Sequence, residues 1–205
     1  MAVFTEINET QLNEFLACYF SHYKVTRFEG ITAGIENSNF WLDVNLAGKA
    51  SHWVLTVFEM SDGKELPSIV RLMQHLANNR LPVPAPVNDQ HGSAIRELVS
   101  KPSLLVPKAS GQYIACPGAD ECHQAGRFLG RMHQVSQNLK CTIPLARDAH
   151  WLRQRQKDIL RHGPPALSQA DQSLLNDEIR YSAQLLTSMS RCPTGWIHGD
   201  LFVDN

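Results

Sequence analysis

The strongest limit on the fold of this chain comes from a run of alternating side chains at residues 39–46. Phe40, Leu42 and Val44 fall on one face of an extended segment, while Trp41 and Asp43 fall on the other. Alternation with a period of two is typical of a β-strand that buries one face and leaves the other accessible. An antiparallel sheet with one covered face is therefore a main part of the predicted fold.

Four more strand-like runs surround this segment in the first hundred residues. They cover residues 25–31, 52–59, 93–99 and 103–106, and residues 47–49 form a turn before the second of these runs. Two helices interrupt the strands. The first spans residues 8–20, with Asn8 and Gln11 as a capping box, and the second spans residues 65–79, with Ser61 and Asp62 as candidate caps. We predict a five-stranded antiparallel sheet with helices packed on it.

Helical periodicity dominates the rest of the chain. The segment at residues 107–111 contains proline and glycine and predicts a hinge. Helices are expected at residues 119–135, at residues 151–160 and again after Ser168, which can cap the last of them. The buried face of that last helix is expected to carry six residues: Leu174, Leu175, Ile179, Leu185, Leu186 and Met189.

The charge balance argues against a polyanionic partner. The chain has 19 Lys and Arg residues against 20 Asp and Glu residues, for a net charge of −1, and it contains no long basic run. Proteins that bind nucleic acid or anionic membranes carry a basic patch. We therefore expect a small-molecule partner, no nucleic acid and no membrane; the oligomeric state stays open.

The cysteines and the N-terminal residues bear on location. Five cysteines without a Cys-x-x-Cys pair indicate neither a disulfide framework nor a zinc site. No stretch has the basic and apolar pattern of a signal peptide or the length of a membrane span. A cytoplasmic protein with reduced thiols is the expectation.

The last ten residues, 196–205, carry the most specific chemical pattern. Asp200 is followed five positions later by Asn205, in a loop flanked by apolar residues. In a kinase catalytic loop an Asp accepts the proton of the substrate hydroxyl, while an Asn further along holds Mg²⁺ against the nucleotide phosphates. This loop predicts phosphoryl transfer from ATP to an alcohol.

The order of sheet, hinge, helices and catalytic loop resembles the choline kinase and aminoglycoside phosphotransferase superfamily, and within it the type II homoserine kinases. Four segments carry the resemblance: residues 31–40, 53–59, 129–133 and 197–205. It implies an α+β, two-lobed, protein-kinase-like fold. A β-rich nucleotide-binding lobe would span residues 1–106, residues 107–111 would form the hinge, and residues 112–205 would form an incomplete helical lobe.

The same resemblance implies roles for individual residues. Asp200 would be the catalytic carboxylate and Asn205 a Mg²⁺ ligand, while His198 would brace the loop, a role compatible with an ordinary buried histidine. The loop covering the ATP phosphates would include Gly34, Glu36, Asn37 and Ser38. A plain hairpin turn is the alternative for this segment. Val106, just before the hinge, and Lys108, within it, would contact the nucleotide.

Two departures from the family pattern have physical consequences. Thr56 occupies the strand position where kinases usually carry a phosphate-binding lysine, so another cation or backbone donors must compensate. The sequence also stops before the segment that would supply a second metal ligand. We therefore expect a fragment of a longer enzyme, with little activity of its own and with Leu201 and Phe202 poorly buried.

The expected reaction is the phosphorylation of L-homoserine by ATP, with Mg²⁺, to give O-phospho-L-homoserine in threonine biosynthesis. One alternative is a kinase for another amino alcohol or an aminoglycoside. The other is a non-catalytic remnant that binds nucleotide.

Overall fold

The computed structural model describes most of the chain, namely residues 3–32, 36–60, 63–112, 114–140, 149–163, 167–189 and 194–202. The chain divides into two compact units, of which the first comprises Met1–Thr142 together with Trp196–Asn205 and the second comprises Ile143–Gly195. Residues 107–111 lie between the last strand and the next helix. The lobe boundary that we place there stays a prediction.

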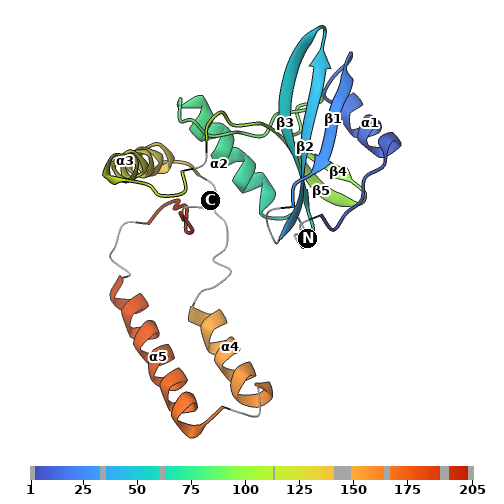
Figure 1. Ribbon diagram of the computed structural model, residues 1–205. Helices are drawn as coiled ribbons and strands as arrows, with labels where there is room; N and C mark the ends of the chain where they lie inside the picture. The colour runs from blue at the N-terminus through green and yellow to red at the C-terminus, as the bar shows by residue number, and fades with distance from the viewer. Residues whose placement is uncertain are drawn as a thin grey trace. The chain divides into compact units, whose positions relative to one another are not determined.

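A five-stranded antiparallel sheet, in the order β1-β2-β3-β5-β4, forms the centre of the first unit (Figure 1). Its strands are β1 (Lys24–Gly30), β2 (Asn37–Leu46), β3 (Lys49–Phe58), β4 (Ile95–Leu98) and β5 (Lys101–Pro107). The predicted five-stranded sheet is confirmed, with strand ends that differ from the expected ones by a few residues.

The tight turn between β2 and β3 sets the register of the longest pairing in the sheet. Ala47 and Gly48 both have positive φ, at 50° and 87°, as a two-residue hairpin turn with the twist of its strands requires. The Gly48 N–H donates to Asn45 Oδ1 at 2.7 Å. From Leu46 opposite Lys49, the pairing continues to Asn37 opposite Phe58.

Helix α1 (Glu9–Ala17) covers one face of the sheet. It begins with the predicted capping box, because Asn8 Oδ1 accepts the Gln11 N–H at 2.9 Å and Gln11 Oε1 accepts the Asn8 N–H at 3.0 Å. Its apolar stripe packs into one continuous core with side chains of the sheet. The buried members of this core are Leu12, Phe15, Leu16, Phe40, Leu42, Val44, Leu55, Val57, Leu98 and Leu105.

Helices α2 (Leu66–Asn78) and α3 (Ala119–Ser136) complete the first unit. Figure 1 shows α1 and α2 on opposite sides of the sheet. Val70 of α2 packs against Leu104, and the C-terminal half of α2 contacts Met132 of α3 through Leu76. The N-cap of α2 is Glu65, without a side-chain cap; the expected caps Ser61 and Asp62 lie outside the described residues.

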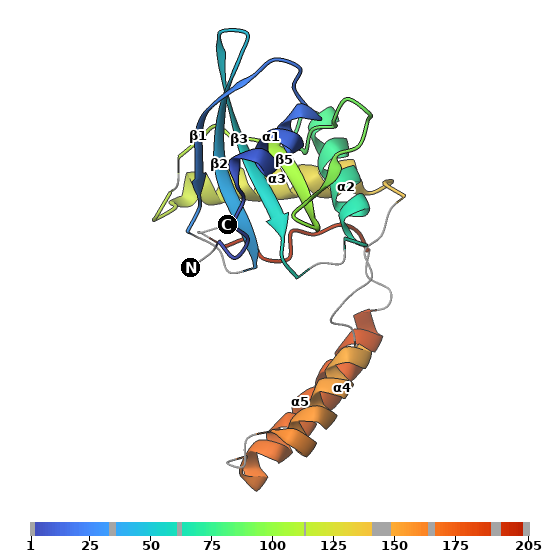
Figure 2. The same ribbon diagram turned by 90° about the vertical axis from the view of Figure 1, so that its right-hand side faces the viewer.

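The second unit contains α4 (Ala149–His162) and α5 (Gln169–Ser188), which run side by side (Figure 2). Gln156 Nε2 donates to Asn176 Oδ1 at 2.6 Å between them. Ser168 caps α5 as predicted, since its Oγ accepts the Asp171 N–H at 3.2 Å. The expected buried face of this helix is wrong in part, because α4 covers only a narrow strip of it. Four of the six residues are 45% to 68% exposed, namely Leu174, Leu185, Leu186 and Met189.

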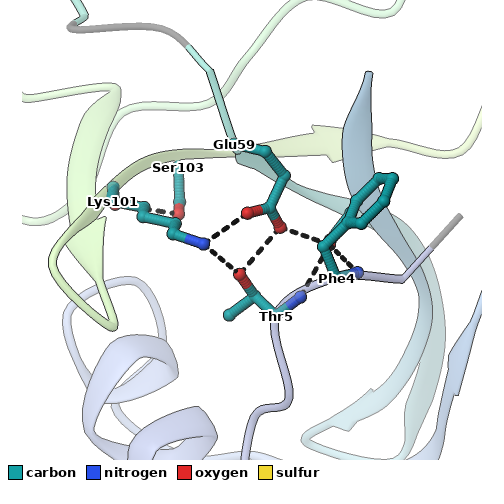
Figure 3. A network of polar contacts seen from close by, with 6 residues as sticks. Phe4, Thr5, Glu59, Lys101 and Ser103 are labelled. Atoms are coloured by element: carbon teal, nitrogen blue, oxygen red, sulfur yellow. Dashed lines mark hydrogen bonds and ion pairs between the residues drawn. The ribbon is translucent and has the colours of Figure 1, made fainter. Parts of the chain in front are cut away.

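A buried polar network closes the end of the sheet where β2 begins and β3 ends (Figure 3). The Glu59 carboxylate directly follows β3 and accepts hydrogen bonds from Thr5 Oγ1 at 2.7 Å, from Ser38 Oγ and from Lys101 Nζ. Lys101 Nζ also donates to Thr5 Oγ1 at 2.7 Å. The Glu59 side chain is only 7% exposed, so these donors replace the water that the carboxylate loses on folding.

None of the helices in the described residues combines the length and the apolar character that a membrane crossing requires.

Truncating the centre of the core tests how the sheet is held. Leu55 is fully buried in the core under α1. Leu55→Ala should lower the free energy of unfolding by about 2–5 kcal/mol, because the cavity left behind adds to the lost transfer free energy. Urea denaturation measures the change. Met60→Ala is the matched control, since Met60 is 91% exposed and its truncation should shift the unfolding midpoint little.

Acid should weaken the fold through Glu59. Burial alone raises the pKa of its carboxyl group, but the hydrogen bonds from Lys101, Ser38 and Thr5 outweigh burial, and the net pKa lies below the ordinary value. Stability from this group is therefore present above the unfolded-state pKa and is lost as pH falls through the folded-state pKa. Glu59→Gln should flatten the pH dependence of the unfolding free energy in that window.

The matched control for the pH experiment is Glu29→Gln. Glu29 forms an exposed pair with Arg27, and such pairs contribute little because water and salt screen them. If Glu59→Gln and Glu29→Gln change the pH dependence of the unfolding free energy equally little, the buried network does not couple stability to pH.

Candidate active site

The face of the sheet opposite α1 brings together residues from three strands. Asn39 of β2 lies opposite Thr56 of β3, and Trp41 lies opposite Val54, which in turn pairs with Val106 of β5. Residues directly opposite in an antiparallel pair share a face. Helix α2 covers this face at Phe58 and Leu104, but Asn39, Trp41, Val54 and Thr56 are only half-buried. An apolar strip with polar ends thus remains accessible.

The position of the absent kinase lysine lies on this strip. Thr56 Oγ1 donates to Asn39 Oδ1 at 2.8 Å, so its proton is already used within the sheet. The position supplies neither a positive charge nor a free donor. Any compensating charge must come from another element.

Lys108 brings a cation to the same face. Its N–H donates to the His52 carbonyl at 3.0 Å, which continues the β3–β5 ladder beyond Pro107. Its ammonium lies 4.8 Å from the centroid of the Trp41 ring, within the range of a cation–π contact. Of the two residues expected at the nucleotide site, Lys108 therefore lies beside Trp41, while Val106 lies one strand further across the sheet, opposite Val54.

Sequence reasoning did not assign Trp41 a functional role. The signal was present in the alternation of residues 39–46, where this large aromatic side chain shares a face with Asp43 and Asn45 rather than with the apolar core residues. An aromatic ring on an accessible face of the sheet is a natural surface for a planar ligand.

A cavity of about 590 Å³ lies where the β1–β2 loop meets the start of α2. Its lining includes two of the residues expected to cover the phosphates, Glu36 and Asn37, together with Phe58, Met60, Glu65, Leu66 and Ile69. The carboxylates of Glu36 and Glu65 disfavour a bare phosphate nearby, since like charges repel. Phosphate contacts from this loop would have to come from backbone N–H groups. Gly34 lies outside the described residues.

Ser38, the fourth expected residue of the phosphate-covering loop, directs its hydroxyl into the buried network instead. The Oγ atom accepts the Phe4 N–H at 2.8 Å and the Thr5 N–H at 3.1 Å, and it donates to Glu59. The residue is fully buried. The three hydrogen bonds of this hydroxyl therefore fix the start of β2 to the N-terminal segment and to Glu59.

The terminal loop presents His198 and Asp200 at the surface of the first unit. Both residues are exposed, so the interpretation of His198 as an ordinary buried histidine is wrong. Gly199 between them has a φ of 83°, a left-handed conformation that side chains with a Cβ adopt only with strain. Leu201 and Phe202 are 48% and 67% exposed, which confirms that they are poorly buried. The glycine thus turns the chain sharply between the histidine and the aspartate.

The expected metal site can be compared with the structure only within the described residues. Within the described ranges, no three His, Cys, Asp or Glu side chains gather into a group that could hold a metal ion. The expected ligand Asn205 lies outside those ranges.

The chain is similar to two bacterial proteins named homoserine kinase. It is 36% identical over 210 residues to the one from Paraburkholderia phytofirmans and 35% identical over 207 residues to the one from Cupriavidus necator. All of this chain is covered in both alignments, but only 60% and 61% of those proteins are covered. The chain thus spans about 60% of the length of these relatives.

Solved structures of small-molecule kinases share the fold. Amicoumacin kinase hAmiN, in complex with AMP-PNP, Ca²⁺ and Ami, superposes with a TM-score of 0.66 at 20% sequence identity, covering 97% of this chain and 60% of that one. Spectinomycin phosphotransferase APH(9)-Ia, in complex with ADP and spectinomycin, gives 0.63 at 14% identity, covering 98% and 65%. The predicted kinase-like α+β fold is confirmed.

The family model described as "Phosphotransferase enzyme family" matches residues 27–205, from within β1 to the last residue. This match includes the accessible sheet face, the β1–β2 loop and the terminal loop with Asp200. It agrees with the resemblance found in the sequence, and the chain belongs to the phosphotransferase enzyme family.

Proposed function

We propose that this chain acts in the ATP-dependent phosphorylation of the L-homoserine hydroxyl, which yields O-phospho-L-homoserine. The observation that carries the proposal is 36% identity, over the whole chain, to a protein named homoserine kinase. The reaction belongs to the biosynthesis of threonine, and we expect it to take place in the cytoplasm.

The accessible sheet face is the proposed nucleotide site. Val54 and Val106 provide apolar surface for a base, and the Trp41 ring provides a flat surface for contact with it. Lys108 adds a positive charge near the same ring. AMP-PNP and ADP in the complexes of the two neighbouring kinases agree with a nucleotide ligand for this fold.

Asp200 is the proposed acceptor of the substrate proton. The alcohol oxygen attacks the γ-phosphorus of ATP, the bond from that phosphorus to the bridging oxygen breaks, and ADP leaves. The hydroxyl proton passes to the Asp200 carboxylate, whose exposure leaves it accessible to an alcohol. His198 would brace the turn at Gly199.

Asn205 is the proposed ligand of a divalent metal, and Mg²⁺ suits the oxygen donor of its amide side chain. Mg²⁺ bound there would neutralise charge on the phosphates. Glu36, Asn37 and the expected loop residue Gly34 would lie near the phosphates, with Ser38 holding the strand that follows. The low activity expected of residues 1–205 alone stays a prediction, which an assay of this chain beside the full-length gene product tests.

The reaction is tested by ADP release from the full-length gene product, with homoserine, choline and an aminoglycoside supplied in parallel. Homoserine should give the highest kcat/KM. Asp200→Asn should lower kcat about 10²–10⁴-fold, because it removes a positioned proton acceptor, while nucleotide binding is retained.

The matched control for Asp200→Asn is Asp158→Asn in α4, where the carboxylate forms an exposed pair with Arg155. It should leave kcat near that of the wild type. Turnover of an aminoglycoside or choline without turnover of homoserine would replace the proposed substrate. Nucleotide binding without any turnover would favour a non-catalytic protein.

The nucleotide site is tested separately at the sheet face. Trp41→Leu and Lys108→Met should each raise the dissociation constant of ATP about three- to tenfold, because they remove the stacking surface and its nearby cation. Isothermal titration with a non-hydrolysable ATP analogue measures the effect. Lys49→Met in the β2–β3 hairpin is the charge-matched control, and an effect of the same size there would contradict a specific role for Lys108.

A further inference from the structure

We propose that the N-terminal segment, residues 3–5, acts as a clamp that positions the β1–β2 loop over the nucleotide. The clamp consists of this segment together with Ser38, Glu59 and Lys101. Thr5 and Ser38 are its positioning residues, since they act on the loop without touching a ligand. The inference rests on the nucleotide site proposed above.

The clamp holds the β2 end of the loop through hydrogen bonds. Ser38 Oγ accepts two consecutive backbone N–H groups of the N-terminal segment, from Phe4 at 2.8 Å and from Thr5 at 3.1 Å. Ser38 directly follows Asn37, which lines the cavity next to the start of α2. The strand that leaves the loop is thereby fixed to the N-terminal segment.

The same segment holds the β1 end of the loop by close packing. A Cβ atom on Gly30, the last residue of β1, would lie 2.6 Å from Val3 Cγ2, which is closer than two carbon atoms approach without displacement. The Ile31 N–H donates to the Asn39 carbonyl at 2.8 Å and joins the two strand ends. Both strand ends that flank the loop are therefore held by one segment.

Glu59 and Lys101 fix the clamp to the rest of the sheet. Glu59 follows β3 and Lys101 begins β5, and both hydrogen-bond Thr5, with Lys101 Nζ and Thr5 Oγ1 2.7 Å apart. The Thr5 hydroxyl thus accepts from one charged partner and donates to the other. Because the carboxylate is buried, loss of this hydroxyl would leave charged groups with fewer partners.

The clamp lies on the opposite face from the nucleotide site. Ser38 belongs to the alternating set that faces α1, whereas Asn37 and Asn39 belong to the accessible face. Its residues can therefore change the geometry of the loop without removing any atom that would touch ATP. A loop held in its binding position loses less conformational entropy when the ligand binds.

The test uses Thr5→Val and Ser38→Ala in the full-length gene product. Each removes one hydroxyl group with little change in size. The dissociation constant of a non-hydrolysable ATP analogue should rise about five- to tenfold in each variant. Ser38→Ala removes the three hydrogen bonds of that hydroxyl, and Thr5→Val removes the two that tie the segment to Glu59 and Lys101. Amide hydrogen exchange in residues 31–39 should accelerate in parallel.

Two further variants serve as controls. Thr26→Val removes a strand hydroxyl that donates to the Asp43 carbonyl at 3.1 Å, away from the loop, and should leave nucleotide affinity unchanged. Thr5→Ser keeps the hydroxyl group and should restore both affinity and exchange. These two variants separate a positioning role from a general loss of stability.

The packing contact supplies an independent test. Gly30→Ala should weaken nucleotide binding, because its Cβ displaces Val3 from the base of the loop. Adding Val3→Ala should relieve the collision and recover part of the affinity. Both readouts use nucleotide alone, so they do not depend on which alcohol is phosphorylated.

The clamp is overturned if Thr5→Val and Ser38→Ala lower the melting temperature but leave nucleotide affinity and exchange in residues 31–39 unchanged. That outcome would show a purely structural network. Failure to phosphorylate homoserine would leave the clamp standing, provided that the wild type binds the ATP analogue. Absence of nucleotide binding in the wild type would overturn both the clamp and the nucleotide site.

Discussion

The pairing of β2 with β3 is the constraint on which the rest of the first unit depends. The two strands are joined by a two-residue turn and remain in register from Leu46 opposite Lys49 to Asn37 opposite Phe58. A shift of one residue would move every apolar side chain of β2 from the α1 side to the other face. With the register fixed, one face becomes the core and the other carries Asn39, Trp41 and Thr56. The candidate nucleotide site is therefore a product of the same alternation that folds the sheet.

The distribution of charge follows from this division into two faces. A Lys–Glu pair is present at the end of β3, but it lies in the buried network, where Lys101 is held by Glu59 and Thr5. The accessible face has a neutral threonine at the position of the kinase lysine, and its cation, Lys108, comes from beyond the end of β5. One ammonium group thus stabilises the sheet, and another is available beside an aromatic ring.

Local patterns in the sequence predicted the parts of the fold that depend on neighbouring residues. The strand at residues 39–46, the capping box of Asn8 and Gln11, and the turn at Gly48 each rest on contacts within a few positions, and all are confirmed. The kinase-like fold came from resemblance to a family, and it too is confirmed.

What the sequence could not predict depends on segments far apart in the chain. Thr5, Glu59 and Lys101 meet because β5 pairs with β3 and the N-terminal segment crosses their ends, which no local pattern encodes. For the same reason, the sequence gives no sign that the hydroxyl of Ser38, a residue expected in the phosphate-covering loop, takes part in the buried network. On α5, helical periodicity identified an apolar stripe but not the area that its neighbour covers.

The close approach of Val3 to Gly30 has a practical consequence for handling the protein. A purification tag or linker joined to the chain shortly before Val3 would lie next to the contact that packs against the end of β1. A bulky or charged leader at that point would displace Val3 and so change the packing at the base of the nucleotide loop. Kinetic constants measured on a tagged protein should therefore be compared with those of the protein after the tag and its linker are removed.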